Sequence, residues 1–136
     1  MRKRYVAGLS IVLAAAPLGG LVLLGPGQAA GAAPVAMSFK DDVLPVFQEH
    51  CVSCHHAPDG EGFKASGLDL TTYQGVMKGT KFGPMVIPGN PETSNLMRLL
   101  DWEVPPQIRM PHGQKQLSVC DRNAIRTWIR EGAKDN

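Results

Sequence analysis

Apolar positions repeat at the spacing of an α-helix in four segments of the chain, residues 38–50, 71–78, 90–100 and 118–132. Helical spacing gathers such side chains on one face of the helix, and that face packs on a core. No segment alternates apolar and polar positions well enough to predict a β-strand. The pattern therefore predicts an all-α domain with about four short helices.

Capping residues indicate where these helices begin. Ser38 and Ser118 each precede an aspartate by three positions, which is the pattern of a capping box. Asn90 and Pro91 form an N-cap followed by a proline at the first helical position. Pro45 interrupts the first apolar stripe, so the regular helix is expected to start at that residue.

Three long loops, residues 56–69, 79–90 and 101–117, connect the predicted helices. Loops of this length need a surface to pack on, because otherwise they stay mobile. Four short helices in so small a domain also provide little apolar material for a core. A large apolar cofactor would meet both needs.

Residues 1–36 differ in composition from the rest of the chain. They contain no Asp or Glu, and a basic start at residues 2–4 precedes an apolar stretch over 6–24 and a run of small residues. This order is typical of a secretory signal peptide, with cleavage expected after Ala32. An uncleaved membrane anchor is the alternative, although a proline and two glycines interrupt the apolar stretch. Both interpretations place residues 37–136 outside the cytoplasm as one domain.

Charge excludes one class of partner. The 136-residue chain has a formal net charge of +2, with 14 Lys and Arg against 12 Asp and Glu. Three of the basic residues lie in the leader, so the exported part has a slight acidic excess and no basic surface for nucleic acid. No Ser-His-Asp set, phosphate-binding loop or carboxylate pair indicates a substrate-converting site, and the chain is not expected to be an enzyme.

Cys51-Val-Ser-Cys54-His55 has the spacing of a c-type haem attachment site. Two thiols three positions apart can each bond one haem vinyl group, and the adjacent histidine can bind the iron. Zinc bound by the same cysteines with histidines or Cys120 is one alternative, and a redox-active dithiol is another. The motif predicts one covalently bound haem c, attached through Cys51 and Cys54, with His55 as the proximal iron ligand.

The second axial ligand decides between electron transfer and the binding of small ligands. Met110 lies between a proline-rich loop and the last helix, and Pro111 restricts it to an extended backbone. Met77 and Met97 lie on predicted helices, where methionine commonly fills the core. Met110 is therefore the predicted distal iron ligand, and His112 or an open coordination site is the alternative.

These motifs resemble, in their order, those of the class I cytochrome c domain, and especially the small exported branch called the planctomycete-type cytochrome c domain. The similarity covers about Phe39 to Ala133 and rests on CVSCH at 51–55, GLDL at 67–70, PGNPETSNL at 88–96, MPHG at 110–113 and WIREGA at 128–133.

The resemblance implies a class I cytochrome c fold with the haem ligands named above. It also implies that the first and last helices cross beside the haem, where Phe47 and Trp128 are expected to meet. Leu68, Leu70 and Ile108 are candidates to line the haem ring. Many members have Met-Pro-Pro at the distal loop, where this chain has Met-Pro-His.

Two further expectations concern the last predicted helix. Cys120 is expected to be a half-buried small residue rather than a reactive thiol. Arg122, Arg126 and Arg130 recur every fourth residue and are expected to form a solvated face.

The sequence thus predicts a periplasmic monohaem c-type cytochrome that carries single electrons between a donor and an acceptor redox protein. Two alternatives stay open: a haem-bearing electron-acceptor subunit of a periplasmic oxidoreductase complex, and a peroxidase-like or ligand-sensing haem protein. Contact with a membrane is expected only if the leader is retained.

Overall fold

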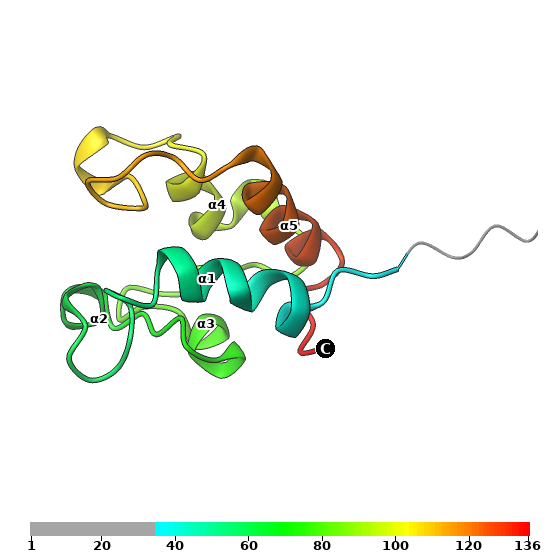
Figure 1. The fold of residues 1–136 in the computed structure, drawn as a ribbon, viewed down its shortest axis with the longest axis horizontal. Coiled ribbons are helices and arrows are strands. Elements are labelled where there is room, and N and C mark those ends of the chain that lie inside the picture. Colours follow the sequence, from blue (N-terminus) through cyan, green and yellow to red (C-terminus); the bar gives the residue numbers. More distant parts are fainter. Residues whose placement is uncertain (1–34) are drawn as a thin grey trace, which may run out of the picture. The chain divides into compact units, whose positions relative to one another are not determined.

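The computed structural model describes residues 35–136, and the regular structure in this range is helical apart from one isolated β-bridge between Thr80 and Gly83 (Figure 1). The predicted all-α class is confirmed. In chain order the elements are a π-helical turn η1 (Phe39–Val43), α1 (Leu44–His50), α2 (Glu61–Ser66), α3 (Tyr73–Lys78), a 3-10 turn η2 (Pro91–Thr93), α4 (Asn95–Leu100), a 3-10 turn η3 (Pro106–Ile108) and α5 (Val119–Arg130).

The predicted leader lies almost entirely outside the described residues. None of the helices within 35–136 is long and apolar enough to cross a membrane.

The predicted helix caps form, each through a hydrogen bond from a backbone amide to a serine side chain. The Ser38 hydroxyl accepts from the Asp41 amide, and the Ser118 hydroxyl accepts from the Asp121 amide, each at 3.1 Å. Pro45 stands in the first turn of α1, directly after η1, so the regular helix starts where the proline predicts.

The prediction of a continuous loop over 56–69 is wrong, because α2 forms within it. This helix is six residues long, contains Gly62 and buries none of its side chains, so it leaves no apolar stripe in the sequence. The segment after Asn90 also differs from the prediction. It breaks at Ser94 into η2 and α4, although the Asn90 side chain does cap η2 by accepting from the Thr93 amide.

Aromatic rings form the centre of the core where η1 packs on α5. The Phe39 ring centroid lies 5.3 Å from that of Trp128 and 5.3 Å from that of Tyr73. Phe47 lies 6.4 Å from Phe39 on the other side. Phe39, which the sequence places on the first apolar stripe, therefore contacts both of the residues that were expected to meet directly.

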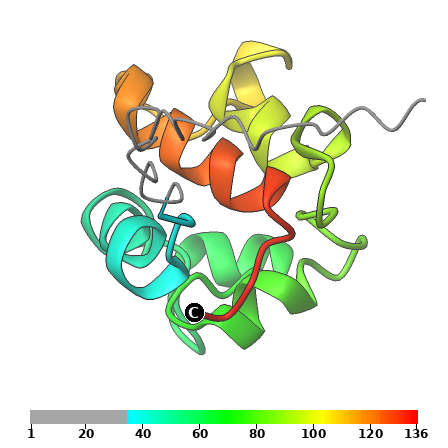
Figure 2. The ribbon, with the colours of Figure 1, turned by 90° about the vertical axis from the view of Figure 1, so that its right-hand side faces the viewer.

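α4 and α5 lie on one side of the domain and α1, α2 and α3 on the other (Figures 1 and 2). The C-terminal segment runs from the end of α5 across to the opposite side (Figure 2). There the Lys40 amide donates to the carbonyl of Asn136 at 3.0 Å, and the Tyr73 hydroxyl donates to that of Ala133 at 2.9 Å. These contacts join the segment that follows α5 to η1 and α3 on the other side of the domain.

The expectation that the arginines of α5 form a solvated face is wrong for two of the three. Arg122 and Arg126 both pair with the carboxylate of Asp101, which follows α4, and the Arg122 contact measures 2.7 Å. The Asp101 side chain is only 11% exposed. Arg130 alone is exposed, 3.7 Å from Glu92. Because Arg122 and Arg126 are four residues apart on one face of α5, both reach Asp101 and connect α5 to the end of α4.

Ser94 provides a test of the turn before α4. Its side chain is fully buried, accepts from the Ile87 amide at 2.9 Å and donates to the Asn90 carbonyl at 2.8 Å. Ser94→Ala would leave both backbone groups without this partner, and we expect the free energy of unfolding to fall by about 1–3 kcal/mol. Urea unfolding followed by circular dichroism measures this change. Thr93→Ala, at an exposed position next to it, is the control; an equal loss in both variants would contradict the role of the buried hydroxyl.

Candidate functional site

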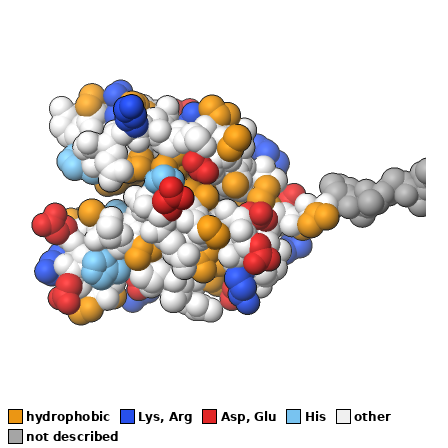
Figure 3. Space-filling model, viewed as in Figure 1, with side chains coloured by type: hydrophobic (Ala, Val, Ile, Leu, Met, Phe, Trp, Pro, Cys, Tyr) orange, Lys and Arg blue, Asp and Glu red, His pale blue; other side chains and the backbone are white. Residues whose placement is uncertain are grey.

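A cavity of about 620 Å³ opens between the two sides of the domain, and the space-filling view shows a slot with apolar side chains at its edge (Figure 3). Its volume lies within the range of pockets that enclose a small molecule or cofactor. The chain lines it from both sides, with segments around residues 50–70, 80–85, 95–100 and 108–114.

Cys51, Cys54 and His55 enter the cavity from the end of α1. Cys51 is the C-cap of this helix, and its amide donates to the Phe47 carbonyl at 2.8 Å. The His55 amide returns to the Cys51 carbonyl at 2.9 Å, so a tight turn brings all three side chains to one wall. Both thiols are free. Burial, with a smaller contribution from Cys54, raises the pKa of the Cys51 thiol to about 12.

The environment of His55 fits a metal-bound imidazole. Burial lowers its pKa, which favours the neutral ring that binds iron, although the Leu68 backbone opposes the shift. The Leu68 backbone lies near the ring, but it does not form a full hydrogen bond with it. The Nδ1 atom of His55 is therefore buried without a hydrogen-bond partner in the described part of the chain. A buried polar atom without a partner is costly, so this ring has unused capacity for a ligand.

Two glycines after the motif, Gly60 at the N-cap of α2 and Gly62 within that helix, provide the space for this turn. A Cβ atom on Gly62 would lie 2.7–2.9 Å from three ring atoms of His55. A Cβ atom on Gly60 would collide with the carbonyl oxygen of Cys54. Neither glycine was singled out from the sequence, because nothing in the local pattern shows what packs against it.

Met110 reaches the same cavity from the loop between α4 and α5. Its amide donates to the Leu99 carbonyl at 3.3 Å, and the peptide bond to the buried Pro111 is cis. His112, the alternative ligand, also lines the cavity but is exposed. Met85 is a second buried thioether in the lining, and the sequence interpretation did not distinguish it.

The structure therefore brings Cys51, Cys54, His55 and Met110 to a single cavity. Leu68, Leu70 and Ile108 line it as expected. Met97 instead lies in the core, as its helical position predicts.

Other candidates are placed elsewhere. The His56 ring turns back to the Val52 carbonyl at 2.8 Å. Cys120 is exposed at the start of α5, so the expectation that it is half-buried is wrong. Among residues 35–136, no three His, Cys, Asp or Glu side chains group closely enough to hold a metal ion.

The comparison with known families agrees with this geometry. Residues 51–112 match the family model described as Planctomycete cytochrome C. This match supports a planctomycete-type cytochrome c domain over residues 51–112. No curated protein and no solved structure is significantly similar to it.

The match to a cytochrome c family makes covalent haem c the expected cofactor and electron transfer the expected general function. The matched segment of this planctomycete-type cytochrome c domain begins at Cys51 and ends at His112. It therefore includes both thiols, the histidine beside them and the methionine across the cavity. Phe39, Phe47 and α5 lie outside the match, whereas Tyr73 of the aromatic core lies within it.

The cavity residues fit this cofactor on their own chemistry. Two thiols, a neutral imidazole with an unpartnered nitrogen and a thioether are donors that haem c uses for attachment and axial ligation. The remaining wall is largely aliphatic, as a porphyrin ring requires, with Leu68, Leu70, Leu96, Leu99, Leu100 and Ile108 among its members.

Proposed function

We propose that this chain is a monohaem c-type cytochrome that carries single electrons between two redox proteins outside the cytoplasm. One observation carries the proposal: a thiol pair, an imidazole and a thioether from distant parts of the sequence line a single apolar cavity. The family match supports haem binding and electron transfer in general.

Each of the four residues has a separate task. The thiols of Cys51 and Cys54 would hold the haem by adding across its two vinyl groups, which forms thioether bonds and requires no oxidant. His55 and Met110 would hold the iron, which would leave no position for an external ligand. Haem iron held by histidine and methionine exchanges one electron between its ferric and ferrous forms.

The cavity wall adjusts how readily the electron is taken up. Aliphatic side chains solvate charge poorly, so they disfavour the oxidised iron, which carries one more positive charge. Methionine ligation acts in the same direction. We therefore expect a reduction potential that suits an acceptor of electrons from other proteins.

Partners and location follow from the same proposal. A carrier must dock briefly with a donor and an acceptor, and such contacts are small and weak. The signal-like leader supports export, and cytochrome c domains are typically exported proteins. The slight acidic excess of residues 37–136 does not favour nucleic acid as a partner.

The absorption spectrum of the exported protein tests the proposal. We expect haem that resists acid–acetone extraction, sharp bands in the reduced form, and no change when carbon monoxide is added. Covalent haem that binds carbon monoxide at once would contradict the carrier function and favour catalysis or sensing. Protein without haem would contradict the whole proposal.

Cysteine variants give the matched control for covalent attachment. In Cys51→Ala with Cys54→Ala, we expect the haem to be lost or to become extractable. Cys120→Ala removes the third thiol, which is exposed and lies outside the cavity lining, and should retain covalent haem. Equal retention in both variants would show that the motif is not the attachment site.

A further inference from the structure

Met110 is carried by a loop that has little regular structure of its own. Between the end of α4 at Leu100 and the start of α5 at Val119, the only helical element is η3. A distal ligand on such a loop stays at the iron only if other contacts hold the loop in place. We propose that Trp102 is the positioning residue that holds Met110 at the cavity. This inference rests on the proposed function, since it takes Met110 as the iron ligand.

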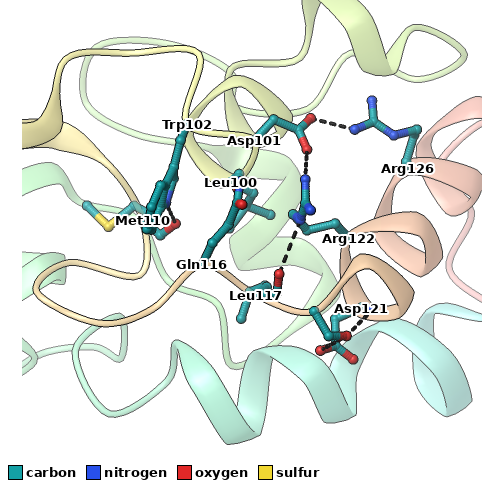
Figure 4. Close-up of polar contacts among 10 residues, drawn as sticks. Leu100, Asp101, Trp102, Met110, Gln116, Leu117, Asp121, Arg122 and Arg126 are labelled. Carbon is teal, nitrogen blue, oxygen red and sulfur yellow. Dashed lines mark hydrogen bonds and ion pairs between the residues drawn. The ribbon is translucent and has the colours of Figure 1, made fainter.

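Trp102 contacts the distal loop from two directions. Its indole nitrogen donates to the carbonyl of Met110 at 2.9 Å (Figure 4). The guanidinium carbon of Arg109 lies 5.2 Å from the centre of the Trp102 ring, within the range of a cation–π contact. Trp102 is not one of the cavity-lining residues, so it acts on the site through the backbone of Met110.

Trp102 is itself held in an unusual backbone conformation. Its φ angle is +62°, a left-handed value that only one other non-glycine residue, Ala133, shares in residues 35–136. Bulky side chains seldom occupy this region, and surrounding contacts must maintain it. This conformation turns the chain after α4 so that the Trp102 indole reaches the carbonyl of Met110, eight positions further along the sequence.

The residue before Trp102 ties this arrangement to α5. Asp101 is bound by Arg122 and Arg126, and both arginines lie on the face of α5 that packs toward α4 (Figure 4). At the other end of the loop, the Gln116 side-chain amide donates to the Leu100 carbonyl at 3.0 Å. Arg122 and Arg126 of α5, together with Gln116 just before it, therefore hold the start of the loop in place. The hydrogen bond from Trp102 then holds the Met110 backbone relative to that start.

Loss of the indole hydrogen bond should shift the loop toward a state in which Met110 has left the iron. One hydrogen bond of this kind corresponds to about a tenfold change in such an equilibrium. The chain contains two tryptophans, and each indole donates to a backbone carbonyl at 2.9 Å. Trp128 does so within the aromatic core, to Lys134 rather than to the distal loop. Trp128→Phe is therefore a matched control for Trp102→Phe.

The experiment compares these two variants as holoproteins. In Trp102→Phe, we expect the weak red absorption band of a thioether bound to ferric iron to fade. We also expect carbon monoxide to bind the reduced protein about tenfold more readily than in the parent, and backbone amides of residues 103–115 to exchange hydrogen faster. Trp128→Phe should lower the unfolding temperature and leave the band and the carbon monoxide response as they are.

Two results separate this inference from the proposed function. If Met110→Ala abolishes the band while Trp102→Phe retains it, resists carbon monoxide and keeps parental exchange, Trp102 is not a positioning residue and the function stands. If Met110→Ala leaves the band intact, the ligand assignment fails and this inference fails with it.

A measurement on the unaltered protein decides the matter if Trp102→Phe does not fold. The two indole N–H groups give separate nuclear magnetic resonance signals, which can be assigned with Trp128→Phe. When imidazole is added at a concentration that displaces the distal ligand, the signal of Trp102 should move or exchange faster while that of Trp128 stays. Equal behaviour of both signals would overturn the inference.

Discussion

If Met110 is the distal ligand as proposed, Met110→Ala is expected to convert a six-coordinate haem protein into one that binds external ligands. The side chain enters the cavity, and alanine leaves a space in which water, azide or carbon monoxide can reach the iron. We expect complete loss of the thioether band and rapid binding of carbon monoxide. Because methionine favours ferrous iron, the reduction potential should fall by on the order of 100 mV. Optical spectra and a redox titration measure both changes.

Met85→Leu is the matched control, because Met85 also brings a thioether to the cavity wall, where it is buried and Met110 is half-buried. Leucine has nearly the same volume, so packing changes little. This variant should retain the band. A band that survives in Met110→Ala and disappears in Met85→Leu would reverse the assignment of the two methionines.

His112 requires a second comparison, because it lines the cavity two residues after Met110. In Met110→Ala alone, this histidine could occupy the vacant position and give a spectrum of two nitrogen ligands. The double variant with His112→Ala removes that route. If only the double variant binds carbon monoxide, His112 is a reserve ligand.

The helices could be predicted where local chemistry determines them. Capping by Ser38 and Ser118 involves groups within a few residues, so the pattern and the structure agree. α2 could not be predicted, because it buries no side chain and its backbone is held by the turn around it. The Gly60 amide donates to His56, and the Phe63 amide donates to Cys54. These contacts depend on how the haem motif folds, which apolar spacing does not describe.

Long-range pairing explains the other errors. Arg122 and Arg126 have the spacing of an ordinary solvated row, and only the approach of α4 brings Asp101 between them. Phe39 was assigned to one apolar stripe, yet it contacts rings from α3 and α5 as well. A single sequence shows which residues share a helix face and not which face meets which.

The sequence predicts the donor residues of the candidate site, but it does not predict the residues that hold these donors in position. CxxCH and a Met-Pro loop identify the donors because their spacing is local and specific. The tie from Trp102 to Met110 spans eight residues of irregular loop, and the contact of Gly62 with His55 crosses a turn. Neither contact can be recognised from a sequence motif, although each involves a predicted iron ligand, Met110 or His55.

Gly62→Ala is the last prediction, and it opposes helix propensity. Gly62 lies inside α2, where alanine would ordinarily stabilise a helix by up to about 1 kcal/mol. Here the added methyl group would lie 2.7–2.9 Å from three ring atoms of His55, which is closer than carbon atoms approach in proteins. Either the imidazole or α2 must move. We expect iron ligation by His55 to weaken and the yield of holoprotein to fall by about 10- to 100-fold.

The readout must separate a displaced ligand from a destabilised fold. Gly89→Ala is the control, because a Cβ atom there meets no atom within 4 Å and the cost comes from its left-handed φ of +81°. That variant should lose about 1 kcal/mol of stability and keep a parental haem spectrum. Gly62→Ala should do the reverse: it should keep its helix content by circular dichroism while the haem becomes high-spin or is not retained. If Gly62→Ala gives a parental spectrum and yield, the imidazole has room to move, and the contact with Gly62 does not position the proximal ligand.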